Sequence, residues 1–205
     1  MTVFEVLVCA SIGYLIGSFQ TSYIIGKIIK GIDIRKFGSK NAGASNALIT
    51  FGWKYGIITV AFDMLKTTIA ILIIRNYVND NLVFSYLTAC FVIIGHIFPF
   101  YMKFKGGKGL ACFIGMVLTL EIKIGIFLII TLIFITVVTD FIVWGTLVIT
   151  GTYPIYVSLT EFNISIIVML TSIFLLIFYK HRINIKRIIC KEEIGLRSIF
   201  TKKAN

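Results

Sequence analysis

The sequence predicts an all-α integral membrane protein, a bundle of seven transmembrane helices, from three observations. Of the 205 residues, 58% are hydrophobic and only 14% are charged, and the mean hydropathy is +0.97. A soluble domain of this composition would expose a large apolar surface and aggregate. The apolar residues also fall into runs near the roughly 20 residues that cross a bilayer. Finally, the cations are concentrated between alternate runs.

We expect the spans at Val3–Ile29, Trp53–Ile74, Leu82–Phe98, Gly109–Leu120, Ile124–Thr139, Phe141–Ser158 and Ile164–Tyr179. The first has no basic leader, so it is predicted to be a transmembrane helix and not a cleaved signal. The fourth is short and has to continue past Glu121 to cross. The apolar stretch 124–158 is too long for one helix and is expected to divide at Asp140. Seven spans are therefore predicted, and six are the alternative.

The distribution of cations predicts the orientation. With seven spans and an outside N-terminus, the inner segments hold 17 of the 20 Lys and Arg residues. The outer segments hold only Arg75 and Lys123, and Lys66 lies inside a span. Because cytoplasmic loops of membrane proteins are rich in Lys and Arg, the N-terminus is expected outside and the C-terminus in the cytoplasm. The net charge of +11 then needs no nucleic-acid partner, and residues 1–205 are expected to form a single membrane-embedded domain.

The four cysteines do not indicate a metal site or a disulfide framework. Cys9, Cys90, Cys112 and Cys190 form no C-x-x-C pair, and no histidine lies at zinc-ligand spacing. Cys9 and Cys90 fall in apolar runs, where cysteine behaves as a small hydrophobic residue. We therefore predict no metal and no cofactor.

The first polar segment, 31–46, mixes small residues, amides and cations. Its glycines and its Ser and Asn residues suit a tight loop that presents hydroxyl and amide groups. The alternative is a turn in which Ser45 or Asn46 caps a helix, with cations that only anchor the loop.

The second polar segment is Lys105-Gly106-Gly107-Lys108-Gly109. Its glycines allow backbone N–H groups to converge on a phosphate, and an apolar helix is expected to begin after Lys108 with its positive end at the same place. The segment is not a Walker A motif, and a glycine hinge is the alternative. His96, shortly before Pro99, is expected to be a packing residue.

The third polar segment begins at Lys180 and includes His181 and Asn184, which share one face of a helix if the last span continues. A basic stretch that contacts anionic lipid is the alternative. Inside the second span, Asp63 and Lys66 lie three residues apart. Because ionisable groups at membrane depth are costly, we expect them to form a structural ion pair, with substrate contact as the alternative.

The motifs in chain order are Gly17-Ser18, Gly26-Lys27, Asp33-Ile34-Arg35, Gly38-Ser39-x-Asn41-x-Gly43-Ala44-x-Asn46, Asp63-x-Leu65-Lys66, Gly95-His96-x-Phe98-Pro99, Lys105–Gly109, and His181-x-x-Asn184-Ile185-x-Arg187 with Glu193. In this order they resemble the bacterial acyl-phosphate:glycerol-3-phosphate acyltransferase family over nearly the whole chain.

The resemblance implies a multi-pass enzyme of the bacterial plasma membrane, with its active site facing the cytoplasm and without a cofactor. Such an enzyme transfers an acyl group from acyl phosphate to the 1-hydroxyl of sn-glycerol 3-phosphate in phospholipid synthesis, giving lysophosphatidic acid and phosphate. The implied partners are these two substrates and membrane lipid, and a monomer is expected.

The resemblance also implies roles for particular residues. Those implied to be catalytic are Ser39, His181 and Asn184. Those implied to bind substrate or phosphate are Arg35, Lys40, Asn41, Asn46, Lys105, Gly106, Gly107, Lys108 and Gly109. Those expected to give structural support are Asp63, Lys66, His96 and Glu193.

The chain departs from the family pattern at several positions. Ile49 stands where the family has a phosphate-binding Arg, Lys40 and Lys191 stand where Gly is usual, and Ser45 and Cys112 replace Thr. Lys40 is hypothesised to supply the missing positive charge. The alternatives are a divergent paralogue with an altered substrate or weak catalysis, and a small membrane transporter. The H-x-x-x-x-D acyltransferases are excluded, because neither histidine has the required Asp.

Overall fold

The computed structural model describes residues 2–201, and every regular element in that range is helical. The α-helices are α1 (Val3–Ser18), α2 (Thr21–Lys30), α3 (Ala44–Phe51), α4 (Trp53–Tyr77), α5 (Leu82–Ile97), α6 (Leu110–Leu120), α7 (Ile122–Thr139), α8 (Ile142–Thr160), α9 (Ile164–Ile189) and α10 (Leu196–Thr201). Two 3₁₀ turns complete them, η1 (Ile34–Lys36) and η2 (Phe100–Met102). The helices form two compact units that divide between Leu120 and Glu121.

Within the described range, six helices are long and apolar enough to cross a membrane. They are Val3–Lys30, which contains α1 and α2, together with Trp53–Tyr77, Leu82–Met102, Ile122–Thr139, Ile142–Thr160 and Ile164–Ile189. Helix α6 is apolar but has only 11 residues. The chain is therefore an all-helical membrane protein with six clear spans and one short apolar helix.

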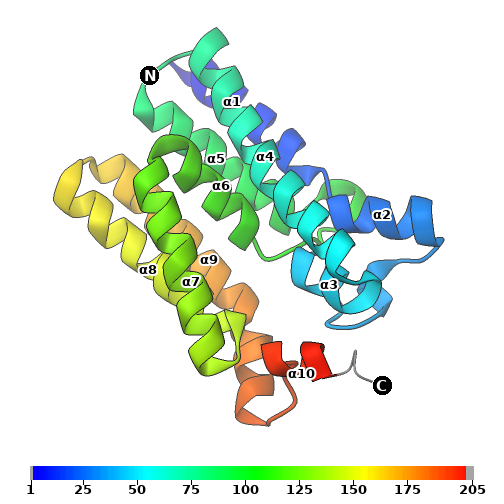
Figure 1. Ribbon diagram of the computed structural model, residues 1–205. Coiled ribbons are helices and arrows are strands. Elements are labelled where there is room, and N and C mark those ends of the chain that lie inside the picture. Colours follow the sequence, from blue (N-terminus) through cyan, green and yellow to red (C-terminus); the bar gives the residue numbers. More distant parts are fainter. Residues whose placement is uncertain (1, 202–205) are drawn as a thin grey trace. The chain divides into compact units, whose positions relative to one another are not determined.

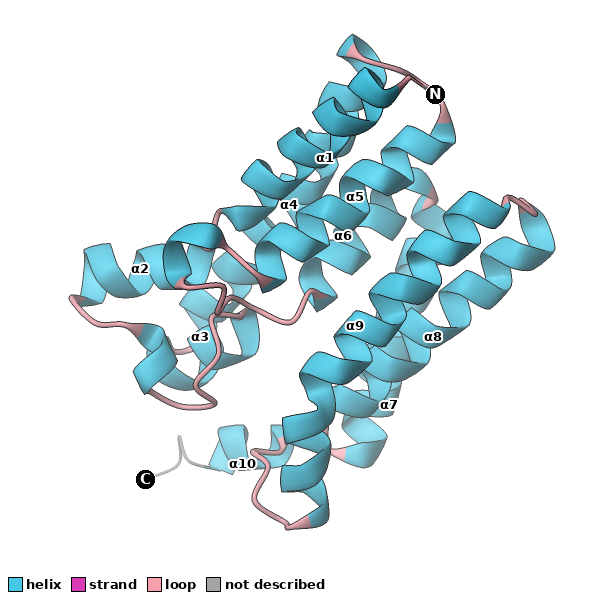
Figure 2. Ribbon diagram, turned by 180° about the vertical axis from the view of Figure 1, so that it is seen from behind, coloured by secondary structure: helices cyan, strands magenta, loops and turns pink. Residues whose placement is uncertain are grey.

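In the first unit, α5 packs against α1, α4 and α6, while α4 also contacts α2 and α3 (Figure 1). The first span is not the single helix expected over Val3–Ile29. Helix α1 ends at Ser18, and α2 begins at Thr21 and turns away from the axis of α1 (Figure 2). The break leaves backbone carbonyls without helical partners, and such groups need donors where water is absent. Lys66 Nζ donates to Phe19 O at 2.7 Å, and the Tyr101 hydroxyl donates to Ser18 O at 2.9 Å.

In the second unit, α8 packs against both α7 and α9. Helix α7 ends at Thr139, and Asp140 takes a left-handed conformation with φ 70° before α8 begins. The predicted division of this apolar stretch at Asp140 is thus confirmed. Helix α9 continues past its predicted end at Tyr179 to Ile189, so the third polar segment begins as helix.

Candidate phosphate-binding and acyl-transfer site

The side chain of Asn46 organises the loop that precedes α3. Its amide nitrogen donates to the carbonyl oxygens of Ile34, Phe37 and Asn41 at 3.0, 3.1 and 2.8 Å, and its Oδ1 accepts from Ser39 N–H at 2.7 Å. Asn46 is fully buried. It was expected to contact phosphate, but its amide binds the loop backbone. These hydrogen bonds hold the conformation of the loop that contains Ser39 and Asn41.

Arg35 joins this loop to the segment after α5. Its guanidinium makes two bonds to the Asp33 carboxylate, at 3.0 and 2.7 Å, and another to Met102 O at 2.7 Å. The guanidinium also lies 5.0 Å from the centre of the Tyr23 ring. The Arg35 bonds lower the pKa of Asp33 below its usual range, and the Asp33 carboxylate raises the pKa of Arg35. Arg35 was expected among the phosphate ligands, but its guanidinium is used in clamping two loops together.

Two residues that depart from the family pattern lie near the Gly38–Ser39 turn: Lys40 follows Ser39 directly, and Ile49 lies close to Gly38. Lys40 is exposed and has φ 61°, a left-handed conformation that favours glycine. Ile49 lies in α3, and its Cγ2 atom is 3.2 Å from where a β-carbon on Gly38 would stand. The side chain of Ile49, at the position where the family carries Arg, therefore faces the Gly38–Ser39 turn.

The glycine segment is bonded to the end of α5. Gly106 N–H donates to Ile97 O at 3.1 Å, and Gly107 N–H donates to His96 O at 3.0 Å. Both N–H groups therefore already have backbone acceptors, and phosphate binding by Gly106 and Gly107 stays a prediction. A helix does begin just after Lys108 as expected: α6 begins at Leu110, preceded by Gly109 with φ 95°. Backbone donors toward an anion here would come from the start of α6.

A buried polar network lies behind the glycine segment. Lys66 Nζ is 2.9 Å from Asp63 Oδ1 and 2.9 Å from His96 Nδ1. The expected ion pair of Asp63 and Lys66 is thus present. Because an ammonium group only donates, His96 Nδ1 accepts, and the neutral ring carries its proton on Nε2. Gly107 needs to be glycine, since a β-carbon there would overlap His96 Nε2.

Gln20 is a member of this network that sequence reasoning missed. Its Nε2 donates to His96 O at 2.9 Å, and its own backbone N–H donates to the Tyr101 hydroxyl at 3.2 Å. The signal for it was present in the sequence, because all residues of 17–22 except Phe19 are small or polar in the middle of an apolar span. Tyr101 had no such signal.

In the second unit, His181 and Asn184 are both buried on α9. His181 Nδ1 lies 2.8 Å from Ile177 O. A carbonyl can only accept, so Nδ1 carries a proton, and in the neutral form of the ring Nε2 is the acceptor. Asn184 Nδ2 donates to Glu193 Oε1 at 2.5 Å. Glu193 therefore contacts Asn184 directly, and its structural role stays a prediction.

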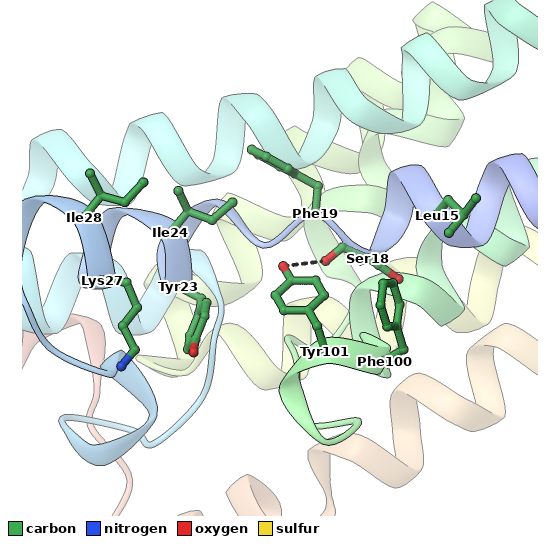
Figure 3. A pocket seen from close by; sticks show the side chains of 9 residues that line it. All are labelled: Leu15, Ser18, Phe19, Tyr23, Ile24, Lys27, Ile28, Phe100 and Tyr101. Carbon is green, nitrogen blue, oxygen red and sulfur yellow. Dashed lines mark hydrogen bonds between the residues drawn. The ribbon is translucent and has the colours of Figure 1, made fainter.

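The first unit also carries a largely apolar groove of about 440 Å³ beside the break between α1 and α2. Figure 3 shows its side chains, with the Tyr101 hydroxyl bonded to the Ser18 carbonyl at its centre and Lys27 beside Tyr23. The groove is lined by Leu15, Ser18, Phe19, Tyr23, Ile24, Lys27, Ile28, Phe100 and Tyr101. Its composition suits an alkyl chain, with a cationic group among the lining residues.

The chain is similar to known proteins over nearly its whole length. The family model described as glycerol-3-phosphate acyltransferase matches residues 7–191. Glycerol-3-phosphate acyltransferase 1 of Oceanobacillus iheyensis is 39% identical, over 97% of this chain and 99% of that protein. The glycerol-3-phosphate acyltransferase of Bacillus subtilis is 36% identical, over 89% and 93%.

Solved structures agree with these relatives. The crystal structure of PlsY (YgiH), an integral membrane glycerol 3-phosphate acyltransferase, in its glycerol 3-phosphate form has a TM-score of 0.85 and 28% identity, over 93% of this chain and 95% of that one. Its lysophosphatidic acid form has a TM-score of 0.83 and 27% identity, over 95% and 96%. From the matched model and these relatives, the chain belongs to the glycerol-3-phosphate acyltransferase family.

Proposed function

We propose that this protein transfers an acyl group from an acyl phosphate to the 1-hydroxyl of sn-glycerol 3-phosphate in bacterial phospholipid synthesis. The observation that carries the proposal is the clamp of Arg35 on Met102 O. This bond joins the loop that precedes α3, which contains Ser39 (the Ser39 loop), to the chain just before the glycine segment. The two are far apart in the sequence.

The joined loops have the charge that two phosphorylated substrates require. Lys36, Lys40, Lys103 and Lys105 are exposed on them, and α6 directs its positive end at the glycine segment. In this proposal Ser39 and Asn41 contact substrate, Lys40, Lys105 and Lys108 hold phosphate oxygens, and backbone N–H groups after Gly109 add donors. The names of the similar proteins specify glycerol 3-phosphate as their substrate.

The chemistry needs no covalent enzyme intermediate. The glycerol hydroxyl oxygen attacks the acyl carbonyl carbon and forms the ester C–O bond. The bond from that carbon to the phosphate oxygen breaks, and its electron pair leaves with phosphate. The hydroxyl proton passes to His181 Nε2, the nitrogen that the bond to Ile177 leaves basic. Positioning and charge stabilisation supply the remaining acceleration.

The proposed membrane arrangement has seven spans, with α6 as the short fourth one, the N-terminus outside and the active site in the cytoplasm. The cation distribution supports it. The chain is proposed to act as a single-domain monomer in the plasma membrane. The groove beside Lys27 is proposed to hold an acyl chain of the donor or of membrane lipid.

The test uses the full chain purified in detergent, with an acyl phosphate and glycerol 3-phosphate. We expect equal release of phosphate and lysophosphatidic acid, and neither product from acyl-CoA. Phosphate release that does not depend on glycerol 3-phosphate would contradict the proposed acceptor. His181→Phe is the matched control, since it fills a similar volume and cannot accept a proton.

Ile49 favours a second candidate, a divergent paralogue with another acceptor. Arg binds phosphate through two parallel bonds that Ile cannot make. Turnover with acyl phosphate and other hydroxyl acceptors, but not with glycerol 3-phosphate, would support this candidate.

A further inference from the structure

The turn between α7 and α8 binds the segment that follows α9. Asp140 O accepts from Leu196 N–H at 2.8 Å, and Asp140 Oδ1 accepts from Arg197 N–H at 2.7 Å. Gly195 is buried against the same side chain, and a β-carbon there would overlap Asp140 Oδ2. Three consecutive residues of the tail are therefore seated on one aspartate.

The same tail carries Glu193, only two residues before Gly195. Glu193 Oε1 accepts the bond from Asn184 Nδ2, and this bond fixes which end of the Asn184 amide is the carbonyl oxygen. Helix α9 ends at Ile189, and Lys191 follows with φ 58°. Lys191 N–H and Glu192 N–H donate back to Ile188 O and Arg187 O. This closing turn brings Glu193 back to its own helix.

We propose that Asp140 is a positioning residue for acyl transfer: it holds the tail so that Glu193 keeps Asn184 oriented. The inference rests on the proposed function and on the catalytic role that the family resemblance implies for Asn184. In the sequence Asp140 marks only a break in an apolar run. The structure instead places it at the start of a chain of contacts that leads through the tail to Asn184.

Two substitutions at Asp140 separate its carboxylate from its backbone conformation. Glycine adopts φ 70° without strain, so Asp140→Gly removes the side-chain acceptor and leaves the backbone conformation accessible. Asparagine tolerates the same conformation and keeps an Oδ1 acceptor. We expect Asp140→Gly to lower kcat/KM by about ten-fold, the effect of losing one hydrogen bond to a charged group, and Asp140→Asn to retain near wild-type activity.

A double-mutant cycle tests whether the effect passes through Glu193. If it does, Asp140→Gly lowers activity in the parent but adds no loss to Glu193→Ala. Full additivity would overturn the proposal, because Asp140 would then act by another route. Gly195→Ala gives a second approach: it is expected to be harmful alone and to add nothing in the Asp140→Gly protein, which has room for the methyl group.

Hydrogen exchange gives a readout that does not depend on turnover. We expect faster exchange at Leu196 and Arg197 in Asp140→Gly, and unchanged exchange at α8. If Leu196 and Arg197 keep their protection in Asp140→Gly, Asp140 does not hold the tail, and the proposal is overturned even if the enzyme is active. If the parent transfers no acyl group, the proposed function fails, and the exchange result still decides whether Asp140 holds the tail.

Discussion

At the residue scale, Lys40 and Lys191 hold backbone conformations that favour glycine. Their φ angles are 61° and 58°, and a side chain in this region costs roughly 1–2 kcal/mol. Glycine would avoid that strain but costs about 0.5–1 kcal/mol in chain entropy. The net penalty of each lysine is thus small, and under the proposed function the positive charge of Lys40 compensates for it.

Lys40→Gly and Lys191→Gly form a matched pair. Each should raise the free energy of unfolding by about 0.5–1 kcal/mol, measured by thermal unfolding in detergent. Only Lys40→Gly should lower kcat/KM for glycerol 3-phosphate, and Ile49→Arg in that background should restore much of it, since position 49 faces the Gly38–Ser39 turn. Equal activity of Lys40→Gly and the parent would disprove the charge-compensation hypothesis.

The stabilising effect of the ion pair between Asp33 and Arg35 should depend on pH. The pKa of Asp33 is lowered in the folded protein, chiefly by its bonds to Arg35. Its stabilising effect is therefore fully present above the unfolded pKa and is lost as the pH falls through the lowered folded value. The difference in Tm between the parent and Asp33→Asn should be constant near neutral pH and vanish in acid. A difference in Tm that persists below the lowered pKa of Asp33 would show that the ion pair with Arg35 is not its cause.

At the element scale, the glycine segment is a connection fitted against the end of α5. Its N–H groups bond to α5 carbonyls, and Gly107 lies against the His96 ring. Arg35, from the loop before α3, bonds to the carbonyl of Met102, which lies three residues before the segment. The segment is thus held between α5 and the Ser39 loop, which places the start of α6.

Gly107→Ala should destabilise the protein by about 1–3 kcal/mol, the usual cost of overpacking. The His96 ring cannot move aside easily, because its Nδ1 accepts from Lys66. Thermal unfolding of Gly107→Ala, His96→Ala and the double variant would show the coupling, with the double less unstable than the sum of the singles. Additive losses would mean that the methyl group and the ring do not meet.

The ion pair within α4 maintains the break between α1 and α2. Lys66→Met should cost about 3–5 kcal/mol, since it leaves the buried Asp63 charge without its partner. The pair of changes Asp63→Leu and Lys66→Met removes both charges and should cost less than Lys66→Met alone. Thermal unfolding of both variants tests this, and an equal loss in the two would exclude the uncompensated charge as the cause.

At the scale of the whole molecule, the cation distribution predicts an outside N-terminus. Cys190 is exposed just after α9, and this prediction places it on the cytoplasmic side. A membrane-impermeant maleimide should label Cys190 only after the cells are opened. In a Cys190→Ser background, Asn76→Cys at the end of α4 should be labelled in intact cells. The reverse pattern would reject the proposed topology.

The sequence alone determined the features that depend on local hydropathy and charge. Long apolar runs predicted helices, because only a helix satisfies its own backbone in a membrane. The polar residue Asp140 marked a real division between two of them. The spacing of Asp63 and Lys66 likewise predicted a pair that needs only one turn of helix.

Only the tertiary structure decided how the loops are joined and which polar groups are already used. The break after Ser18 depends on donors from Lys66 and Tyr101, and the N–H groups of Gly106 and Gly107 depend on carbonyls of α5. Buried backbone groups must find a partner, but several distant residues could supply one. A linear pattern shows that such a group needs a partner, whereas the choice of partner is made by the packing of helices far apart in the chain.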